Sequence, residues 1–572
     1  MSSTLYRDAA LADGRSPRLQ VGVSLLAEGG RVRWIRPAGD EGERPAGCEV
    51  VDAGGTTIVP GLVDGHSHLT LPGGSHWIER GADPTGTLAA VAEFNGELQY
   101  RSGVRWARDV GSPRRAYDGG ERAVSIGVRD RWRGRRDRPY VRAAGTWITV
   151  AGVLPVGLTV EARDGDELVA AAIGQLDDGA DFVKLYLDGP DPETAPWTAA
   201  EVGRVAGAVH ARGAKVTAHA TRLSGARVCA EAGVDSIEHG FELDADVARL
   251  MAERGVALVT TMTVLKSWLT FATTTAIPRF AGPQSRARTL DRLEQARHSV
   301  RLAHAAGVAI VGGTDFGGGS ARANQLPWEV ECLVEAGLEP WEALAAVTWR
   351  GGVLLGEPEA GVIRVGGPAD FSLVHGDPLS DPTALWRIWR VALSATTGAD
   401  TRAAGCRDQG GADPAAQPGS KRRCRAPRLR DSSPGGLCLF QHAVRPVGRR
   451  CIRRRFPGAC DGGAGDRRHV LRRKGCGPAF GARPSVLAVP ADVGACRAAI
   501  GYQQAERMHD AAQGTLGCLK RAGSVGLRGR RWFGQCQTGT GRRLFRSRFR
   551  GRGQPVNCHT GHVGVPPEVG PT

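Results

Sequence analysis

The sequence predicts an α/β fold, a (β/α)8 TIM-like barrel with a small β-sandwich domain beside it. Three observations lead to this prediction. From His66 onward, short apolar segments alternate with Ala-rich amphipathic segments, as in repeated βα units. Eight strand candidates fall within about 250 residues, which is typical of a closed barrel. Short alternating segments broken by glycine precede this region, and a further alternating segment follows it.

The flanking segments are expected to pair with each other. Residues 19–26 and 31–36 alternate apolar and polar side chains, as antiparallel strands do. Residues 369–374 show the same alternation after the barrel and are expected to return to the N-terminal sheet. The expected boundaries are therefore 1–60 and 351–392 for the two parts of the β-domain, the second of them truncated, and 61–350 for the barrel.

The barrel strands are predicted from apolar runs that end in a polar residue or a loop. Amphipathic helices are expected between them, for example at 164–177, 199–212, 223–232 and 244–254. The eight strand candidates end near residue 68 or lie at 106–110, 140–144, 182–186, 215–219, 236–239, 257–261 and 308–315.

Charge divides the chain into an acidic body and a basic tail. Residues 1–400 carry 42 Lys+Arg against 50 Asp+Glu, whereas residues 401–572 carry 33 against 9. The overall charge of +16 therefore arises from the tail. An Arg-rich tail is compatible with nucleic-acid binding, and this is the alternative function from another class.

The tail at 393–572 is predicted to be non-native or disordered rather than a further domain. From about residue 391, Glu and Lys nearly vanish while Arg, Gly, Cys and Pro increase, and no strand or helix periodicity persists. Ten cysteines fall in this tail without any Cys-x₂₋₄-Cys pair, so a cysteine metal module is excluded. A frameshift near residues 390–400 explains the abrupt change in composition.

Cysteine usage and hydropathy predict a cytoplasmic protein. The body contains only Cys48, Cys229 and Cys332, which does not form a disulfide framework. The N-terminus lacks the pattern of a secretory signal, and no apolar run approaches the ~20 residues of a membrane helix. No membrane partner is expected, and a homo-oligomer is left open.

Metal-binding side chains recur where the predicted strands end. His66 and His68 lie two positions apart on one strand, so both imidazoles project to the same face. His219, His239 and Asp315 end three later strands. In such barrels these ends meet at one rim, so the sequence predicts a metal site there. Individually, each histidine is compatible with a structural role, and Asp315 with capping a turn.

Lys184 is a further candidate, because it lies inside an apolar strand and the body contains only three lysines. A buried cation without a partner is costly. A neutral amine reacts with CO₂ to form a carbamate, which can bridge two cations. A buried salt bridge is the alternative.

These motifs resemble the amidohydrolase superfamily, in its imidazolonepropionase-like and Xaa-Pro-dipeptidase-like branch. The resemblance covers about residues 1–390 and includes PGLVDGHSHL, GVRWARDVG, DFVKLYLDG, KVTAHA, VDSIEHG, VGGTDFG and GGPADFSLV. It implies that His66, His68 and Asp315 hold one metal ion and that His219 and His239 hold a second. Carboxylated Lys184 would bridge two divalent ions, most simply Zn²⁺, although iron or manganese would also fit.

The resemblance further implies hydrolysis of a carbon–nitrogen bond in a small amide, dipeptide-like or cyclic amide substrate. A metal-activated water attacks, and Asp315 acts as general base and then as general acid. Tyr186 and His76 are the candidate substrate-binding residues, with packing as the alternative role for Tyr186. The same residues allow two alternative interpretations. One is a barrel without catalytic activity, and the other is an amidohydrolase impaired by the frameshift.

Overall fold

The computed structural model describes residues 2–155, 157–392, 533–537 and 542–546. The chain divides into two compact units, Met1–Asp408 and Gln409–Thr572. In the second unit, β20 (Phe533–Gln537) and β21 (Arg542–Arg546) form an antiparallel pair, which the expectation of an unstructured tail did not include. The other predictions for 393–572 lie outside the described residues.

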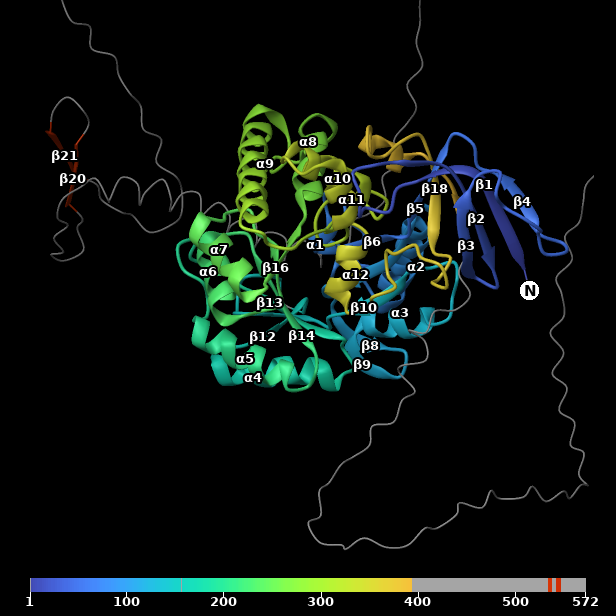
Figure 1. The fold of residues 1–572 in the computed structure, drawn as a ribbon. Coiled ribbons are helices and arrows are strands. Elements are labelled where there is room, and N and C mark those ends of the chain that lie inside the picture. The colour runs from blue at the N-terminus through green and yellow to red at the C-terminus, as the bar shows by residue number, and fades with distance from the viewer. Residues whose placement is uncertain (1, 156, 393–532, 538–541, 547–572) are drawn as a thin grey trace, which may run out of the picture. The chain divides into compact units, whose positions relative to one another are not determined.

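One seven-stranded sheet contains strands from both ends of the first unit (Figure 1). The residue 369–374 segment forms β18, which pairs antiparallel with β5, as Ile58 opposite Leu373 illustrates. The predicted return to the N-terminal sheet is therefore confirmed. The seven strands are β1 (Ser3–Leu11), β2 (Gln20–Glu28), β3 (Arg31–Pro37), β4 (Glu49–Asp52), β5 (Thr56–Pro60), β18 (Phe371–His375) and β19 (Ile388–Val391).

The sequence predicted a β-sandwich, but these strands form one continuous hydrogen-bonded sheet. They do so because β1 pairs with three other strands. Its first half pairs with β4 and its last two residues pair with β5, while β2 pairs along its other side. Leu25, Ile58 and Phe371 are fully buried and form part of the sheet's own apolar core. At one edge, β19 pairs with β18 and with no other strand of the described residues.

The eight predicted parallel strands are all present, in two sheets. One sheet has the order β10-β7-β6 and the other β12-β11-β13-β14-β15-β16-β17. The short strands β11 and β12 extend the second sheet beyond the prediction. The strands are β6 (Leu62–Ser67), β7 (Val104–Asp109), β10 (Tyr140–Ala143), β11 (Trp147–Thr149), β12 (Thr159–Glu161), β13 (Phe182–Tyr186), β14 (Lys215–Ala220), β15 (Ser236–His239), β16 (Ala257–Thr260) and β17 (Ile310–Gly312).

Backbone hydrogen bonds join these two sheets on both sides. The amide of Asp181, just before β13, donates to the carbonyl of Ala143 at 2.8 Å. The amide of Asp315, just after β17, donates to the carbonyl of His66 at 2.8 Å. The carboxyl ends of β6 and β17 are thereby held side by side, which places His66 next to Asp315.

Helices follow most of these strands and cover the sheets (Figure 1). The four helices predicted at 164–177, 199–212, 223–232 and 244–254 are confirmed within one or two residues. Asp164 and Thr198 cap the first two by accepting backbone hydrogen bonds. The main helices are α2 (Thr85–Arg101), α3 (Val124–Trp132), α4 (Gly165–Asp177), α5 (Ala199–His210), α6 (Leu223–Ala232), α7 (Ala245–Arg254), α8 (Met262–Thr274), α9 (Gly282–Ala305), α10 (Leu326–Glu335), α11 (Pro340–Ala346) and α12 (Trp349–Leu355).

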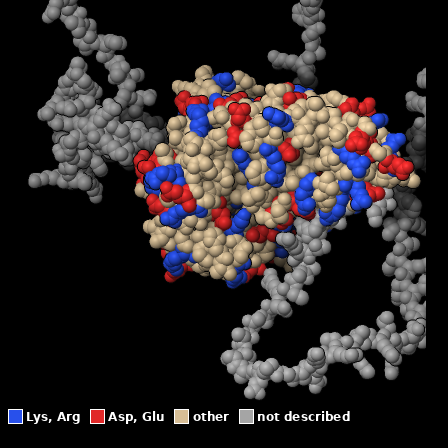
Figure 2. All heavy atoms as spheres, in the orientation of Figure 1, with Lys and Arg blue, Asp and Glu red and all other residues tan. Residues whose placement is uncertain are grey.

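Among the described residues, no helix combines the length and the apolar character that crossing a lipid bilayer requires. On the face shown in Figure 2, basic and acidic side chains of the body are interspersed.

Candidate metal centre

Three side chains converge where β6 and β17 end. Nε2 of His66 and Nε2 of His68 each lie 3.3 Å from Oδ1 of Asp315. One ligand atom from each residue lies within 4.8 Å of the others, and all three residues are buried. This is a group that could hold a metal ion, as the sequence predicted. The spacing of two along the strand brings both imidazoles to the same side.

A hydrogen bond at Nδ1 of His66 and another at Nδ1 of His68 determine which nitrogen of each ring could bind a metal ion. Nδ1 of His66 donates to Oε2 of Glu238 at 2.6 Å, and Nδ1 of His68 donates to the carbonyl of Gly111 at 2.7 Å. With Nδ1 engaged on each ring, Nε2 is the nitrogen that each ring can offer to a metal ion together with Asp315. Such outer hydrogen bonds usually accompany histidine ligands of metals.

His239 extends this group toward the end of β15. Its ring centroid lies 4.8 Å from that of His66 and 4.4 Å from that of His219. Nδ1 of His239 pairs with the hydroxyl of Thr261 at 2.7 Å, whereas Nε2 is buried and finds no hydrogen-bond partner among the described residues. A buried polar atom without a partner is unfavourable unless a ligand engages it.

His219 is oriented by two contacts at the end of β14. Its Nε2 lies 3.1 Å from Oδ2 of Asp188, and its ring stacks on Tyr186 with centroids 3.8 Å apart. Although burial acts in the opposite direction, His219 and the bonds from Thr221 lower the pKa of Asp188 to about 2. An ionised Asp188 accepts a hydrogen bond from the N–H at Nε2. Nδ1 of His219 is then unprotonated and is the nitrogen that could bind a metal ion.

Two residues of the group have unusual backbone conformations. His239 has φ 74° and Asp315 has φ 49°, in the left-handed region that non-glycine residues rarely occupy. Backbone strain of this kind concentrates at functional sites.

Lys184 lies on β13 and is almost fully buried. Burial lowers its pKa to about 8, although the charges of Glu238 and Asp315 oppose this shift. Within the part of the chain that the structure describes, no hydrogen bond or ion pair engages Nζ. The salt-bridge alternative therefore has no close partner, and a lysine with a lowered pKa is a suitable amine for carbamate formation.

Glu238, like Asp188, is a residue of this site that the sequence reasoning did not identify. Besides His66, its carboxylate accepts hydrogen bonds from Nη1 of Arg108 at 2.8 Å and from Thr217. Burial opposes ionisation, but Arg108 and Lys184 hold the pKa of Glu238 well below its usual range. The sequence feature that could have revealed Glu238 is its position: it is a charged residue directly before His239 in an apolar strand.

The two candidate substrate residues occupy different surroundings. Tyr186 lies against His219, as described above. His76 precedes α1 (Trp77–Arg80), its side chain is 65% exposed, and its nearest ion-pair partner is Glu79 at 3.9 Å. Across the described ranges, no contact joins His76 to the histidine group.

Comparison with known proteins identifies the family. The sequence profile of the amidohydrolase family matches residues 57–394, which is more than half of the chain. The chain belongs to the amidohydrolase family. It is an enzyme of the class that hydrolyses carbon–nitrogen bonds, as predicted from its motifs.

Individual relatives agree with this assignment. A Mycobacterium tuberculosis protein named as uncharacterized is 32% identical over 388 residues, which cover 67% of this chain and 96% of that protein. An imidazolonepropionase from Streptomyces avermitilis is 27% identical, covering 62% of this chain and 80% of the enzyme. The crystal structure of a Xaa-Pro dipeptidase with bound methionine matches with a TM-score of 0.58 at 26% identity, over 69% of this chain and all of that one. The expected resemblance to these two enzyme types is confirmed.

Proposed function

We propose that this amidohydrolase hydrolyses a small amide with two divalent metal ions. His66, His68 and Asp315 would hold one ion, and Nδ1 of His219 with Nε2 of His239 would hold the other. The observation that carries this proposal is the convergence of two imidazole nitrogens on Asp315, next to a third that is buried without a partner. Nitrogen-rich ligand sets favour Zn²⁺.

The carbamate of Lys184 would bridge the two ions. Its position on β13, between the strands of His68 and His219 in the chain, and its interactions with Glu238 and Asp315 support this role.

We also propose that the two parallel sheets form one closed (β/α)8 barrel, because backbone hydrogen bonds join them on both sides. In that case residues 61–350 form the barrel, and residues 1–60 and 351–392 form the β-domain. Residues 393–572 are proposed to be a non-native tail.

Asp315 moves the proton in the proposed reaction. Although burial opposes it, the pairing with His66 and His68 holds the pKa of Asp315 well below its usual range, so the group is ionised at neutral pH. When bound, the metal ions supply Lewis-acid chemistry that polarises the scissile carbonyl and acidifies water. The Asp315 carboxylate accepts the proton of the attacking water and returns it to the leaving nitrogen.

Arginines near the histidine group favour a substrate that carries a carboxylate. Arg292 on α9 interacts electrostatically with Asp188, which in turn contacts His219. Arg292 also interacts with Arg222, Glu242 and Arg279, so three arginines share this region with the two carboxylates of Glu242 and Asp188. Its guanidinium lies 5.9 Å from the ring centroids of Phe241 and Trp268, which adds an aromatic wall.

This arrangement fits N-acyl amino acids and dipeptides better than neutral cyclic amides. Bidentate arginine contacts are the usual means of recognising a carboxylate. Tyr186, stacked on His219, is the proposed contact for the substrate carbonyl. A cytoplasmic location is proposed from the scarcity of cysteine in the body.

Replacing Asp315 by Asn tests the proposal. Because a general base contributes about 10²–10⁴ in rate, Asp315→Asn is expected to lower turnover by that amount while most of the metal remains bound. Asp291→Asn, at an exposed position of α9, is the matched control and should leave turnover unchanged. Metal content by mass spectrometry and hydrolysis of a dipeptide panel are measured together. Full activity in Asp315→Asn contradicts the proton-shuttle role.

A further inference from the structure

A cavity of about 270 Å³ lies at the ends of the strands opposite to the histidines. Lys215 begins β14 and lines this cavity, whereas His219 lies four residues later on the same strand. A strand rises about 3.3 Å per residue, so the two positions are separated by about 13 Å. The cavity is therefore a place distinct from the candidate metal centre. Phe182, Leu354 and Leu355 contribute apolar walls.

Most charged groups around this cavity already have partners. Arg142 is paired with Glu357. Asp181 accepts a hydrogen bond from Arg129 at 2.7 Å. Asp235 accepts hydrogen bonds from Nε2 of His210 and from a backbone amide, both at 2.8 Å. These groups therefore do not need a ligand in the cavity.

Lys215 differs from them. Its ammonium donates to the carbonyl of Leu354 at 2.6 Å and more weakly to that of Val353 at 3.5 Å. In residues 2–155 and 157–392 no carboxylate forms a salt bridge with it. An ammonium has three donors, so at least one remains for a ligand. Burial and the nearby charge of Arg108 lower the pKa of Lys215, although Asp235 opposes this shift.

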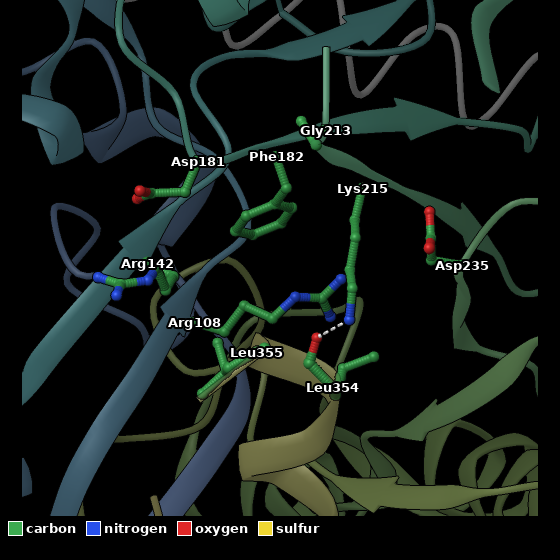
Figure 3. Close-up of a pocket in the computed structure, with 11 residues that line it drawn as sticks. Arg108, Arg142, Asp181, Phe182, Gly213, Lys215, Asp235, Leu354 and Leu355 are labelled. Carbon is green, nitrogen blue, oxygen red and sulfur yellow. Dashed lines mark hydrogen bonds between the residues drawn. The ribbon is translucent and has the colours of Figure 1, made fainter. Parts of the chain in front are cut away.

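Arg108 presents a second cation to the same space. In Figure 3 its guanidinium lies beside the end of Lys215, whose ammonium is directed to the carbonyl of Leu354. Nη1 and Nη2 of Arg108 donate to Gly65, Glu238 and Ser236, and over the described residues Nε has no hydrogen-bond acceptor. Arg108 is already ion-paired with Glu238, so Lys215 is the cation of this space whose charge has no carboxylate partner among the described residues, and Nε of Arg108 offers a further donor.

We propose that this cavity binds a small organic carboxylate, with its oxygens between Lys215 and Arg108 and its carbon chain against Phe182 and Leu355. The volume suffices for such a molecule together with water, since one water occupies about 30 Å³ in the liquid. Inorganic phosphate offers the same oxyanion chemistry, without a carbon chain for the apolar walls. This site lies apart from the proposed metal centre, to which it is linked only through the ion pair of Arg108 with Glu238.

Calorimetric titration of the full chain with propionate, and separately with inorganic phosphate, tests this proposal at constant ionic strength set with chloride. Lys215→Gln should weaken propionate binding at least tenfold, since a hydrogen bond to a charged group contributes about 1.5–3 kcal/mol. Lys215→Arg should retain affinity within about threefold because it keeps the charge. Lys266→Gln is the matched control, since Lys266 pairs with Glu331 elsewhere in the fold.

A second measurement does not depend on the stability of Lys215→Gln. The chain has only six lysines, so ¹³C-methylated lysine signals can be resolved by NMR and that of Lys215 assigned by its absence in Lys215→Arg. Propionate should shift this signal. A shift with phosphate and not with propionate identifies phosphate as the source of the oxyanion. If neither probe moves the Lys215 signal or binds with a dependence on Lys215, the proposal is wrong. Metal content and amide hydrolysis stay separate readouts.

Discussion

His66 and Glu238 form a buried hydrogen bond of 2.6 Å between Nδ1 and a carboxylate oxygen. The two residues come from strands that are far apart in sequence, β6 and β15. Arg108, from β7, holds the other carboxylate oxygen at 2.8 Å. Three strands therefore determine the direction in which Nε2 of His66 points.

Replacing Glu238 by Gln is expected to weaken metal binding. A carboxamide keeps the shape but removes the charge that holds the Nδ1 proton, and loss of such outer partners typically costs about 10- to 100-fold in metal affinity. Competition with a chelator measures this affinity. Glu253→Gln, on the surface of α7, is the control. Because Glu238→Gln also leaves Arg108 without its ion pair, circular dichroism must confirm that the variant is folded. Unchanged affinity in a folded variant excludes the proposed role of Glu238.

Lys184→Ala is expected to lower activity by more than about 100-fold. Removing a residue that only hydrogen-bonds to a metal ligand typically costs about 10- to 100-fold, and this variant removes a bridging ligand itself. Added acetate should restore part of the activity by supplying a carboxylate where the carbamate is missing. Lys266→Ala, whose side chain pairs with Glu331, should behave as the unmodified chain with and without acetate. Retention of full activity in Lys184→Ala would rule out the bridging carbamate.

Arg292→Gln is expected to raise KM for carboxylated substrates by about tenfold or more, because a hydrogen bond to a charged group contributes about 1.5–3 kcal/mol. KM for a matched amide without the carboxylate should hardly change. Steady-state kinetics on such a substrate pair provide the test. Arg301→Gln, on the same helix and paired with Glu294, is the control. Equal effects on both substrates would show that Arg292 does not read the carboxylate.

The sequence was most informative where periodicity and residue type coincide. The eight parallel strands follow from apolar runs, and the meeting of His66, His68 and Asp315 follows from their place at strand ends. The partners that orient the histidines were not predictable in this way. Asp188 follows β13 in a loop, and Glu238 reads as one more strand residue, so only the folded chain reveals that each contacts a histidine.

The β-domain shows a second limit of sequence patterns. Alternation predicted its strands, but pairing of β1 with β4, β5 and β2 depends on long-range contacts that alternation does not encode. His76 was chosen for its place in the loop after β6, yet a loop residue can turn outward, and its side chain is 65% exposed. The family match ends at residue 394, within the 390–400 window in which the composition changes.

Anomalous X-ray scattering from crystals of the metal-loaded protein tests the two-ion centre most directly. Data collected on both sides of the zinc absorption edge should give two peaks. One should lie at Nε2 of His66 and His68 with Asp315, and the other at His219 and His239, with density for a modified Lys184 between them. The absence of any anomalous peak within coordination distance of these side chains would contradict the account.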